Sequence, residues 1–160
     1  CAEKVEILAD GSIPQVEMTS AGLNDGSLAA EGAYPAAICC NLYNAKIQKK
    51  GHTPVMGNNG RMPYVTCRDD ERFVADLCDN AVMGFKYFAF DGEVTLTVTY
   101  RGQGSLIVYD ETKTLGELTL APSVEWCKAS VEITEKGTHA LYLKTKGDTM
   151  CDILDFSFSR

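Results

Sequence analysis

The chain has 160 residues, with 22 acidic and 15 basic side chains and a formal net charge of -7. This length is sufficient for one domain with a real core, and the acidic balance argues against nucleic-acid binding, which needs clustered Lys and Arg. The one basic cluster, residues 46–50, is short and is predicted to be a solvated loop. No apolar run approaches the roughly 20 residues that a membrane span requires, so we expect a soluble chain.

The first part of the chain differs in composition from the rest. Residues 1–18 alternate weakly around an Asp10-Gly11-Ser12 turn and predict a small hairpin. Residues 19–33 are small and Gly-rich, as is typical of a linker, and the main domain is predicted to cover residues 34–160. Within it, residues 49–62 carry Gly, Pro and Asn and are expected to form a long surface loop.

The segment from Met83 to Ala121 and its continuation to Phe158 show the two-residue period of half-buried strands. Val94, Leu96, Val98 and Tyr100 alternate with threonines. Further short strands are expected over residues 105–110, 116–121, 128–134, 139–145 and 151–158, punctuated by glycines and without a crossover helix. The fold is therefore predicted to be all-β, a β-sandwich (jelly roll) of antiparallel strands.

The seven cysteines contain no CxxC pair and no histidine at metal-ligand spacing, so zinc is not expected. Cys40, Cys127 and Cys151 fall in apolar or strand-like runs and are predicted to be buried thiols that act as small hydrophobic side chains. This favours a reducing setting, either the cytoplasm or the secreted proteins of an anaerobe, over a disulfide scaffold.

A complete catalytic constellation is not found in the sequence, and the chain is not expected to be an enzyme by itself. His52 and His139 are the only histidines and have no specific partners in sequence. The adjacent acids of residues 69–71 are typical of a solvated turn. Neither a phosphate-binding loop nor a GxSxG motif occurs.

Aromatic residues in or beside predicted loops suggest sugar binding. A sugar ring presents an apolar C–H face and a rim of hydroxyls, so its site needs exposed aromatic rings and a carboxylate or amide that fixes orientation. The candidates are Tyr43, Tyr64, Phe73 and Trp126. For each of them, packing as a lid on the core is the alternative.

Several segments together resemble a carbohydrate-binding module of family 6: FVADLCDNAVMGFKYFAF (residues 73–90), the VTLTV strand, SVEW, and GTHALYLKTKGDTMCDILDFSF. The chain is most similar to the version of this module that follows the catalytic propeller in family 43 glycoside hydrolases of gut and rumen bacteria. These enzymes act as xylosidases and arabinofuranosidases. DGSIPQVEMTSAGLN near the N-terminus resembles the last propeller strands and exit linker of such an enzyme. The resemblance covers nearly the whole chain.

The resemblance implies a jelly roll that grips a sugar between two aromatic residues, with an Asn hydrogen-bonded to its hydroxyls. Phe73 falls at the first aromatic position and Asp152 at the Asn position. Ser123 stands where the second aromatic residue is expected, and Trp126 matches a more structural tryptophan of the pattern. Where the family often has two Glu ligands for a structural calcium, this chain has Cys39 and Asn41, and a neutral thiol is a poor ligand for Ca²⁺. No cofactor is therefore expected.

Two hypotheses follow. In the first, the chain is a non-catalytic module that binds xylan or arabinoxylan and keeps an attached hydrolase near its substrate. In the second, it is a structural accessory domain that packs on the catalytic propeller and has lost its own sugar cleft. A third alternative is that residues 49–62 complete the enzyme's substrate pocket. The resemblance implies a bacterial protein that is secreted or associated with the cell surface, with a cytoplasmic location as the alternative.

Overall fold

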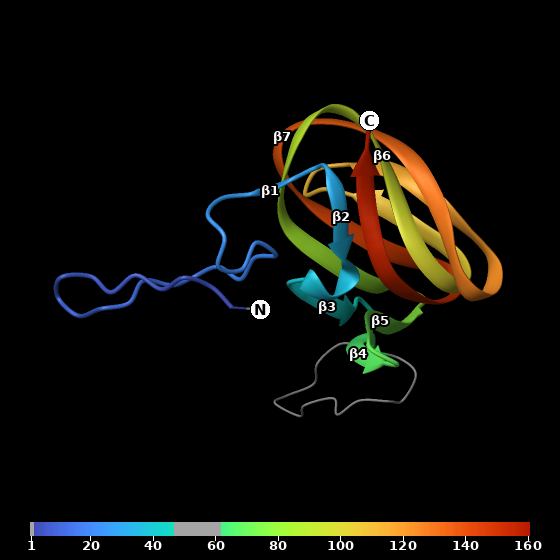
Figure 1. Ribbon diagram of the computed structural model, residues 1–160, viewed down its shortest axis with the longest axis horizontal. Coiled ribbons are helices and arrows are strands. Elements are labelled where there is room, and N and C mark those ends of the chain that lie inside the picture. Colours follow the sequence, from blue (N-terminus) through green and yellow to red (C-terminus); the bar gives the residue numbers. More distant parts are fainter. Residues whose placement is uncertain (1, 47–61) are drawn as a thin grey trace.

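The computed structural model describes residues 2–46 and 62–160, and nearly all of its regular structure is β-strand (Figure 1). Five short strands precede two very long ones, and one short 3₁₀ helix, η1 (Ala36–Ile38), follows the second strand. The strands are β1 (Leu28–Ala29), β2 (Gly32–Pro35), β3 (Asn41–Asn44), β4 (Tyr64–Arg68), β5 (Glu71–Cys78), β6 (Ala81–Tyr109) and β7 (Thr114–Ser159).

Strands β6 and β7 contain the short strands predicted between residues 94 and 158, except for Asp110 at the end of one of them. They remain continuous where the sequence predicted breaks, because the glycines bend the strands instead of ending them. Gly102 and Gly104 have φ angles of 108° and 131°, which L side chains rarely adopt. A Cβ at Gly102 would also meet the carbonyl oxygen of Met150 on the neighbouring part of β7.

The bends let each long strand take part in both layers of the sandwich. In one layer, the strand order is β3, residues 81–90 of β6, residues 138–146 of β7, residues 105–109 of β6 and residues 114–120 of β7. In the other layer, residues 150–158 of β7 lie between β6 and the short strands β2 and β5, and β4 adds to β5. All of these pairs are antiparallel, so the predicted antiparallel sandwich is confirmed. Only the two-residue pair between β1 and β6 is parallel among the described strands.

The core between the layers is apolar and rich in phenylalanine. Val94, Leu96 and Val98 are at most 3% exposed, whereas Thr95 and Thr97 between them are half-buried, which confirms the predicted alternation over residues 94–98. Thr99, predicted on the outer side, is also buried, at 8% exposed. Phe85 and Phe156 pack with ring centroids 4.6 Å apart. Their neighbours Phe88, Phe90 and Phe158 are also buried and contact one another.

The prediction for the cysteines is confirmed for one of the three. Burial raises the pKa of the Cys151 thiol to about 12, and the side chain is 3% exposed. Cys40 and Cys127 are only half-buried. Cys40 lies between η1 and β3, outside the strands, and Cys127 packs against the core from its margin.

The sheet begins at Leu28, inside the segment predicted to be a linker. Leu28 and Ala29 pair with Phe88 and Ala89 of β6, and Leu28 packs against the core. A two-residue strand of this kind leaves no periodic pattern in the sequence, so it was not predicted. The domain boundary at Tyr34 stays a prediction.

Residues 2–18, here called the N-terminal arm, project from the sandwich (Figure 1). The arm turns back at Asp10, whose carboxylate accepts hydrogen bonds from the amide and hydroxyl of Ser12. The predicted turn is therefore present, but no strand is assigned to residues 2–27. The predicted loop at residues 49–62 lies outside the described residues, apart from Met62. None of the helices in the described parts of the chain is long and apolar enough to cross a membrane.

Candidate functional site

Three of the five predicted site residues meet at one place, around a residue that the sequence did not single out. Phe73 of β5 and Trp126 of β7 pack edge to face, with ring centroids 5.5 Å apart. The guanidinium carbon of Arg101, on β6, lies 4.7 Å from the Phe73 centroid and 4.5 Å from the Trp126 centroid. Arg101 thus packs over both rings, in a cation–π arrangement.

Asp152 fixes Arg101 in this position. Its Oδ2 accepts hydrogen bonds from Nε of Arg101 at 2.9 Å and lies 2.8 Å from a terminal nitrogen of the same guanidinium. Its Oδ1 accepts the backbone N–H of Asp76 at 3.1 Å. Both oxygens of the predicted sugar-binding carboxylate are therefore used within the protein.

Asp76 lies at a β-bulge between Val74 and Leu77 and has a φ of 57°. This left-handed conformation is uncommon for residues other than glycine, although aspartate adopts it more readily than most. Here the bulge turns the amide of Asp76 toward Asp152. A hollow of about 460 Å³ lies beside the cluster, and Asp76, Arg101, Ser123 and Asp152 line it.

The aromatic rings of this cluster are poorly placed for stacking on a ligand. Phe73 is 2% exposed, and Trp126 is half-buried with Arg101 over its ring. The indole nitrogen of Trp126 donates to Glu71 at 2.9 Å. Ser123 lines the hollow where the family pattern places a second aromatic residue. A sugar-binding role for Phe73 and Trp126 stays a prediction, and it requires Arg101 to move.

Tyr64 and Tyr43 are not part of the Arg101 cluster. Tyr64 lies on β4 opposite Ala75 and is half-buried. Tyr43, on β3, is 43% exposed and lines a different hollow, of about 610 Å³, together with Tyr109, Tyr142 and residues 110–114. We call Tyr43, Tyr109 and Tyr142 the tyrosine face.

Strand register builds the tyrosine face. Tyr109 of β6 pairs directly with Tyr142 of β7, and their rings stack with centroids 5.1 Å apart and an interplanar angle of 20°. On its other side, Tyr142 pairs with Gly84, where a Cβ would lie 2.7 Å from the tyrosine ring. The glycine therefore leaves the space in which the Tyr142 ring lies. Burial, and then the nearby phenols of Tyr43 and Tyr142, raise the pKa of Tyr109 to about 12, so the phenol stays protonated and can donate a hydrogen bond.

The rim of this hollow is a turn held by Asp110, which is only 2% exposed. Its Oδ1 accepts the amides of Thr112 and Lys113 and the hydroxyl of Thr112. Burial alone would raise the pKa of Asp110, but these hydrogen bonds outweigh it and lower the pKa. The turn beside the three tyrosines is therefore well ordered, with its carboxylate charged at neutral pH.

Sequence reasoning missed Arg101, Tyr109 and Tyr142. A signal for the two tyrosines was present: Leu106 and Val108, like Leu141 and Leu143, are buried core residues. The alternation of a strand then places Tyr109 and Tyr142 on the outer face. No comparable signal marks Arg101, because its partners come from other strands.

One of the two residues at the family's calcium positions, Cys39, fits a calcium ion poorly. Cys39 is 8% exposed, and burial raises the pKa of its thiol to about 11, so it is neutral at physiological pH. Ca²⁺ prefers charged and carbonyl oxygens. Within residues 2–46 and 62–160, no group of three or more His, Cys, Asp or Glu side chains could hold a metal ion.

No model of a known protein family matches the sequence. A xylosidase/arabinosidase of Thermoclostridium stercorarium is 34% identical to the chain over an alignment of 169 positions, which covers 98% of the chain. The chain spans 35% of the length of that protein.

Solved structures similar to the chain include a family 6 carbohydrate-binding module from Clostridium cellulolyticum in complex with xylose. The two structures match with a TM-score of 0.66 and 16% identity, and the match covers 82% of this chain and 99% of that one. The corresponding module from Clostridium stercorarium in complex with cellobiose has a TM-score of 0.67 and 15% identity, and the match covers 86% of this chain and 99% of that one. A family 43 arabinoxylan arabinofuranohydrolase from Bacillus subtilis, in complex with cellotetraose, has a TM-score of 0.62 and 14% identity, with coverage of 99% of this chain and 33% of that one.

The chain thus has the β-sandwich fold of the family 6 carbohydrate-binding modules. Its sequence is similar to part of a xylosidase/arabinosidase, and its fold is similar to part of a family 43 enzyme. The resemblance that the sequence suggested is confirmed.

Proposed function

We propose that the chain is a non-catalytic carbohydrate-binding module of a glycoside hydrolase that degrades plant polysaccharide, and that it binds xylan or arabinoxylan chains. The fold and the similarity to a xylosidase/arabinosidase support the class. The observation that carries the proposal is the tyrosine face, where an exposed Tyr43 and a stacked pair of tyrosines line one hollow. Aromatic rings of this kind offer an apolar surface to sugar C–H groups, and their hydroxyls offer hydrogen bonds.

The tyrosine face suits a sugar better than the Arg101 cluster does. Tyr43 is 43% exposed, whereas Phe73 is 2% exposed. The guanidinium of Arg101 lies over Trp126, and Asp152 already pairs with Arg101. We therefore place the glycan on the tyrosine face, with Tyr43 as the residue that contributes most to binding.

The covered rings of the Arg101 cluster favour a second candidate function. A structural accessory domain of a family 43 glycoside hydrolase, which has lost its own sugar cleft, would retain this fold and fill the cleft with protein side chains. Arg101 packed over Phe73 and Trp126 is what such a filled cleft would look like.

We further propose that residues 1–18 belong with a catalytic propeller of the same enzyme and that the residues after them lead into the module. Matches to the two modules cover 82% and 86% of the chain, whereas the match to the Bacillus enzyme covers 99%. This difference supports an N-terminal part that is shared with the larger enzyme. The module would keep that enzyme at its polymer by raising the effective concentration, which fits a secreted or surface-associated bacterial protein.

Isothermal titration of the chain with xylo-oligosaccharides, arabinoxylan and a β-glucan control, with and without calcium, tests the proposal. Saturable heat with a xylan ligand is expected, and Tyr43→Ala should remove most of it. Trp126→Ala and Tyr64→Ala are the control variants for Tyr43→Ala, because both remove an aromatic ring that is not part of the tyrosine face. Loss of binding in Trp126→Ala alone would move the site to the Arg101 cluster. Absence of heat from a folded sample would favour the structural accessory domain.

A further inference from the structure

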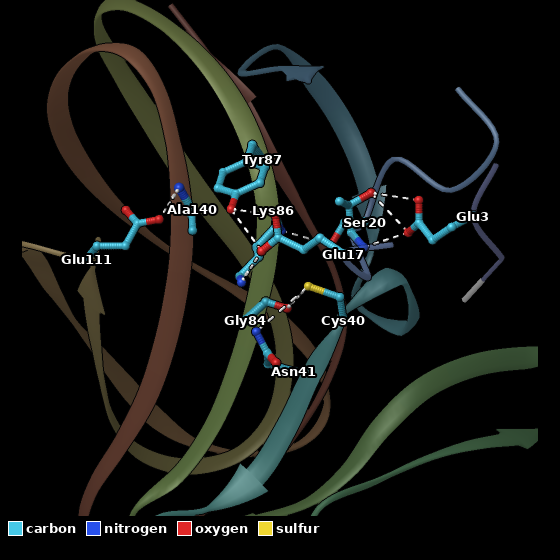
Figure 2. A network of polar contacts seen from close by, with 11 residues as sticks. Glu3, Glu17, Ser20, Cys40, Asn41, Gly84, Lys86, Tyr87, Glu111 and Ala140 are labelled. Carbon is cyan, nitrogen blue, oxygen red and sulfur yellow. Dashed lines mark hydrogen bonds and ion pairs between the residues drawn. The ribbon is translucent and has the colours of Figure 1, made fainter. Parts of the chain in front are cut away.

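The N-terminal arm and the residues that follow it are attached to β6 by a set of polar contacts (Figure 2). Glu17 lies at the centre of this set. Its carboxylate accepts hydrogen bonds from Nζ of Lys86 at 2.7 Å and from the Tyr87 hydroxyl at 3.0 and 3.1 Å. Hydrogen bonds from a charged donor to a charged acceptor are stronger than neutral ones.

Two hydrogen bonds join Ser20, three residues after Glu17, to Lys86 of β6. The amide of Ser20 donates to the carbonyl oxygen of Lys86 at 2.5 Å, and the amide of Lys86 donates to the Ser20 hydroxyl at 3.1 Å. Ala21 is 7% exposed, so the chain at this point lies against the sandwich. Residues 19–33 have the composition of a linker, but these contacts hold the first part of the segment to the sandwich.

The arm itself is tied to the same place. The amide of Thr19 donates to the Glu3 carboxylate at 2.6 Å, and Lys4 pairs with Asp25 at 2.5 Å. The two ends of the arm therefore meet at the point where Glu17 holds the chain to β6. The apolar side chains of the arm remain exposed, by 39–69%: Val5, Ile7, Leu8, Ile13, Val16 and Met18.

We infer that residues 17–21 form a strap that fixes the N-terminal arm to the module, and that Glu17 is its positioning residue. Hinged motion of the arm is then restricted by the ion pair and by the two Ser20–Lys86 hydrogen bonds. The strap itself does not depend on the proposed function, but its consequence does. If the chain is part of a larger enzyme, an enzyme domain that packs on the exposed apolar residues of the arm would be held at a fixed angle to the module. A flexible linker would instead leave the two parts free to reorient.

Hydrogen exchange of the 160-residue chain, followed by mass spectrometry without any sugar, tests the strap. Glu17→Gln removes the charge but keeps the size of the side chain. We expect the amides of residues 18–22, which include the donor of Ser20, to exchange about tenfold faster in this variant. Peptides from residues 94–109 should exchange as in the wild type.

Glu117→Gln is the matched control. Glu117 also accepts a hydroxyl, from Ser105 at 2.6 Å, and pairs with Lys146 at 3.3 Å, but it lies on β7. It should leave residues 18–22 unchanged. Unchanged exchange at residues 18–22 in Glu17→Gln would overturn the strap. Because the exchange is measured without ligand, a failed sugar titration contradicts the proposed function and leaves the strap intact.

Discussion

Arg101 and Asp152 form an ion pair on neighbouring strands, with Nε of the arginine 2.9 Å and a terminal nitrogen 2.8 Å from the same carboxylate oxygen. The pair is largely shielded, since the two side chains are 26% and 21% exposed. The pair determines where the guanidinium lies, because the group that Asp152 holds is the one that packs over Trp126.

The first prediction concerns this pair. Arg101→Ala and Asp152→Asn should each destabilise the chain, and a double-mutant cycle should give a coupling energy of about 1 kcal/mol, between that of exposed and fully buried pairs. Asp152→Asn keeps an oxygen that can accept the Asp76 amide. Its effect on stability therefore reports the loss of the charge and not the loss of that hydrogen bond. Urea unfolding of the four proteins provides the measurement. Strictly additive effects would show that the two side chains do not interact in solution.

The second prediction concerns Phe73, which is 2% exposed and covered by Trp126 and Arg101. Phe73→Ala should cost about 3 kcal/mol of unfolding free energy, as for other buried phenylalanines. For a chain of this size, the melting temperature should fall by roughly 6–12 °C. Calorimetry of wild type, Phe73→Ala and the milder Phe73→Leu measures the change. An unchanged melt would place the ring at the surface and restore it as a sugar platform.

A third prediction uses Gly84, which leaves room for the Tyr142 ring. Gly84→Ala would place a Cβ 2.7 Å from that ring and displace it. If the sugar binds on the tyrosine face, its affinity should fall about tenfold, a change equivalent to about 1.4 kcal/mol.

Gly116→Ala is the control for Gly84→Ala, because its Cβ would meet Val131 at the same distance, 2.7 Å, away from the tyrosines. Both variants should lose some stability through overpacking. Titration calorimetry with a xylo-oligosaccharide compares them. Equal affinities for the two variants would argue against the tyrosine face as the binding site.

The fourth prediction concerns the dependence of stability on pH. Hydrogen bonds from Thr112 and Lys113 lower the pKa of Asp110 below its ordinary value of 3.8, in spite of burial. A carboxyl group with a lowered pKa in the folded state stabilises the fold above its ordinary pKa, and this contribution is lost as the pH falls through the lowered value. The wild type should therefore exceed Asp110→Asn in unfolding free energy at pH 7.

On acidification below about pH 4, the difference between wild type and Asp110→Asn should shrink. Urea denaturation of both proteins between pH 7 and pH 2.5 measures this difference in unfolding free energy. The other carboxylates titrate in both proteins, so their contribution cancels in the difference. A difference that is constant with pH would show that Asp110 acts by shape and not by charge.

The amino-acid sequence by itself determined the all-β class and the inward face of the main strands. Alternation from Val94 to Tyr100 is a local property, because successive side chains of a strand point to opposite faces. The same is true of the turn at Asp10, where a short polar side chain bonds to its own backbone two residues on. These features depend on neighbours in sequence, so the sequence contains them.

Only the tertiary structure decided which of the candidate site residues contact one another. Phe73, Arg101, Trp126 and Asp152 come from separate strand segments, and their contacts depend on the register of β5, β6 and β7. The same register stacks Tyr109 on Tyr142, 33 residues later in the chain. A shift of one residue would turn either side chain to the opposite face of its layer. Register follows from packing the whole core. Local alternation could therefore place Tyr109 and Tyr142 on the outer face, but it could not show that their rings stack or that Arg101 packs over Phe73 and Trp126.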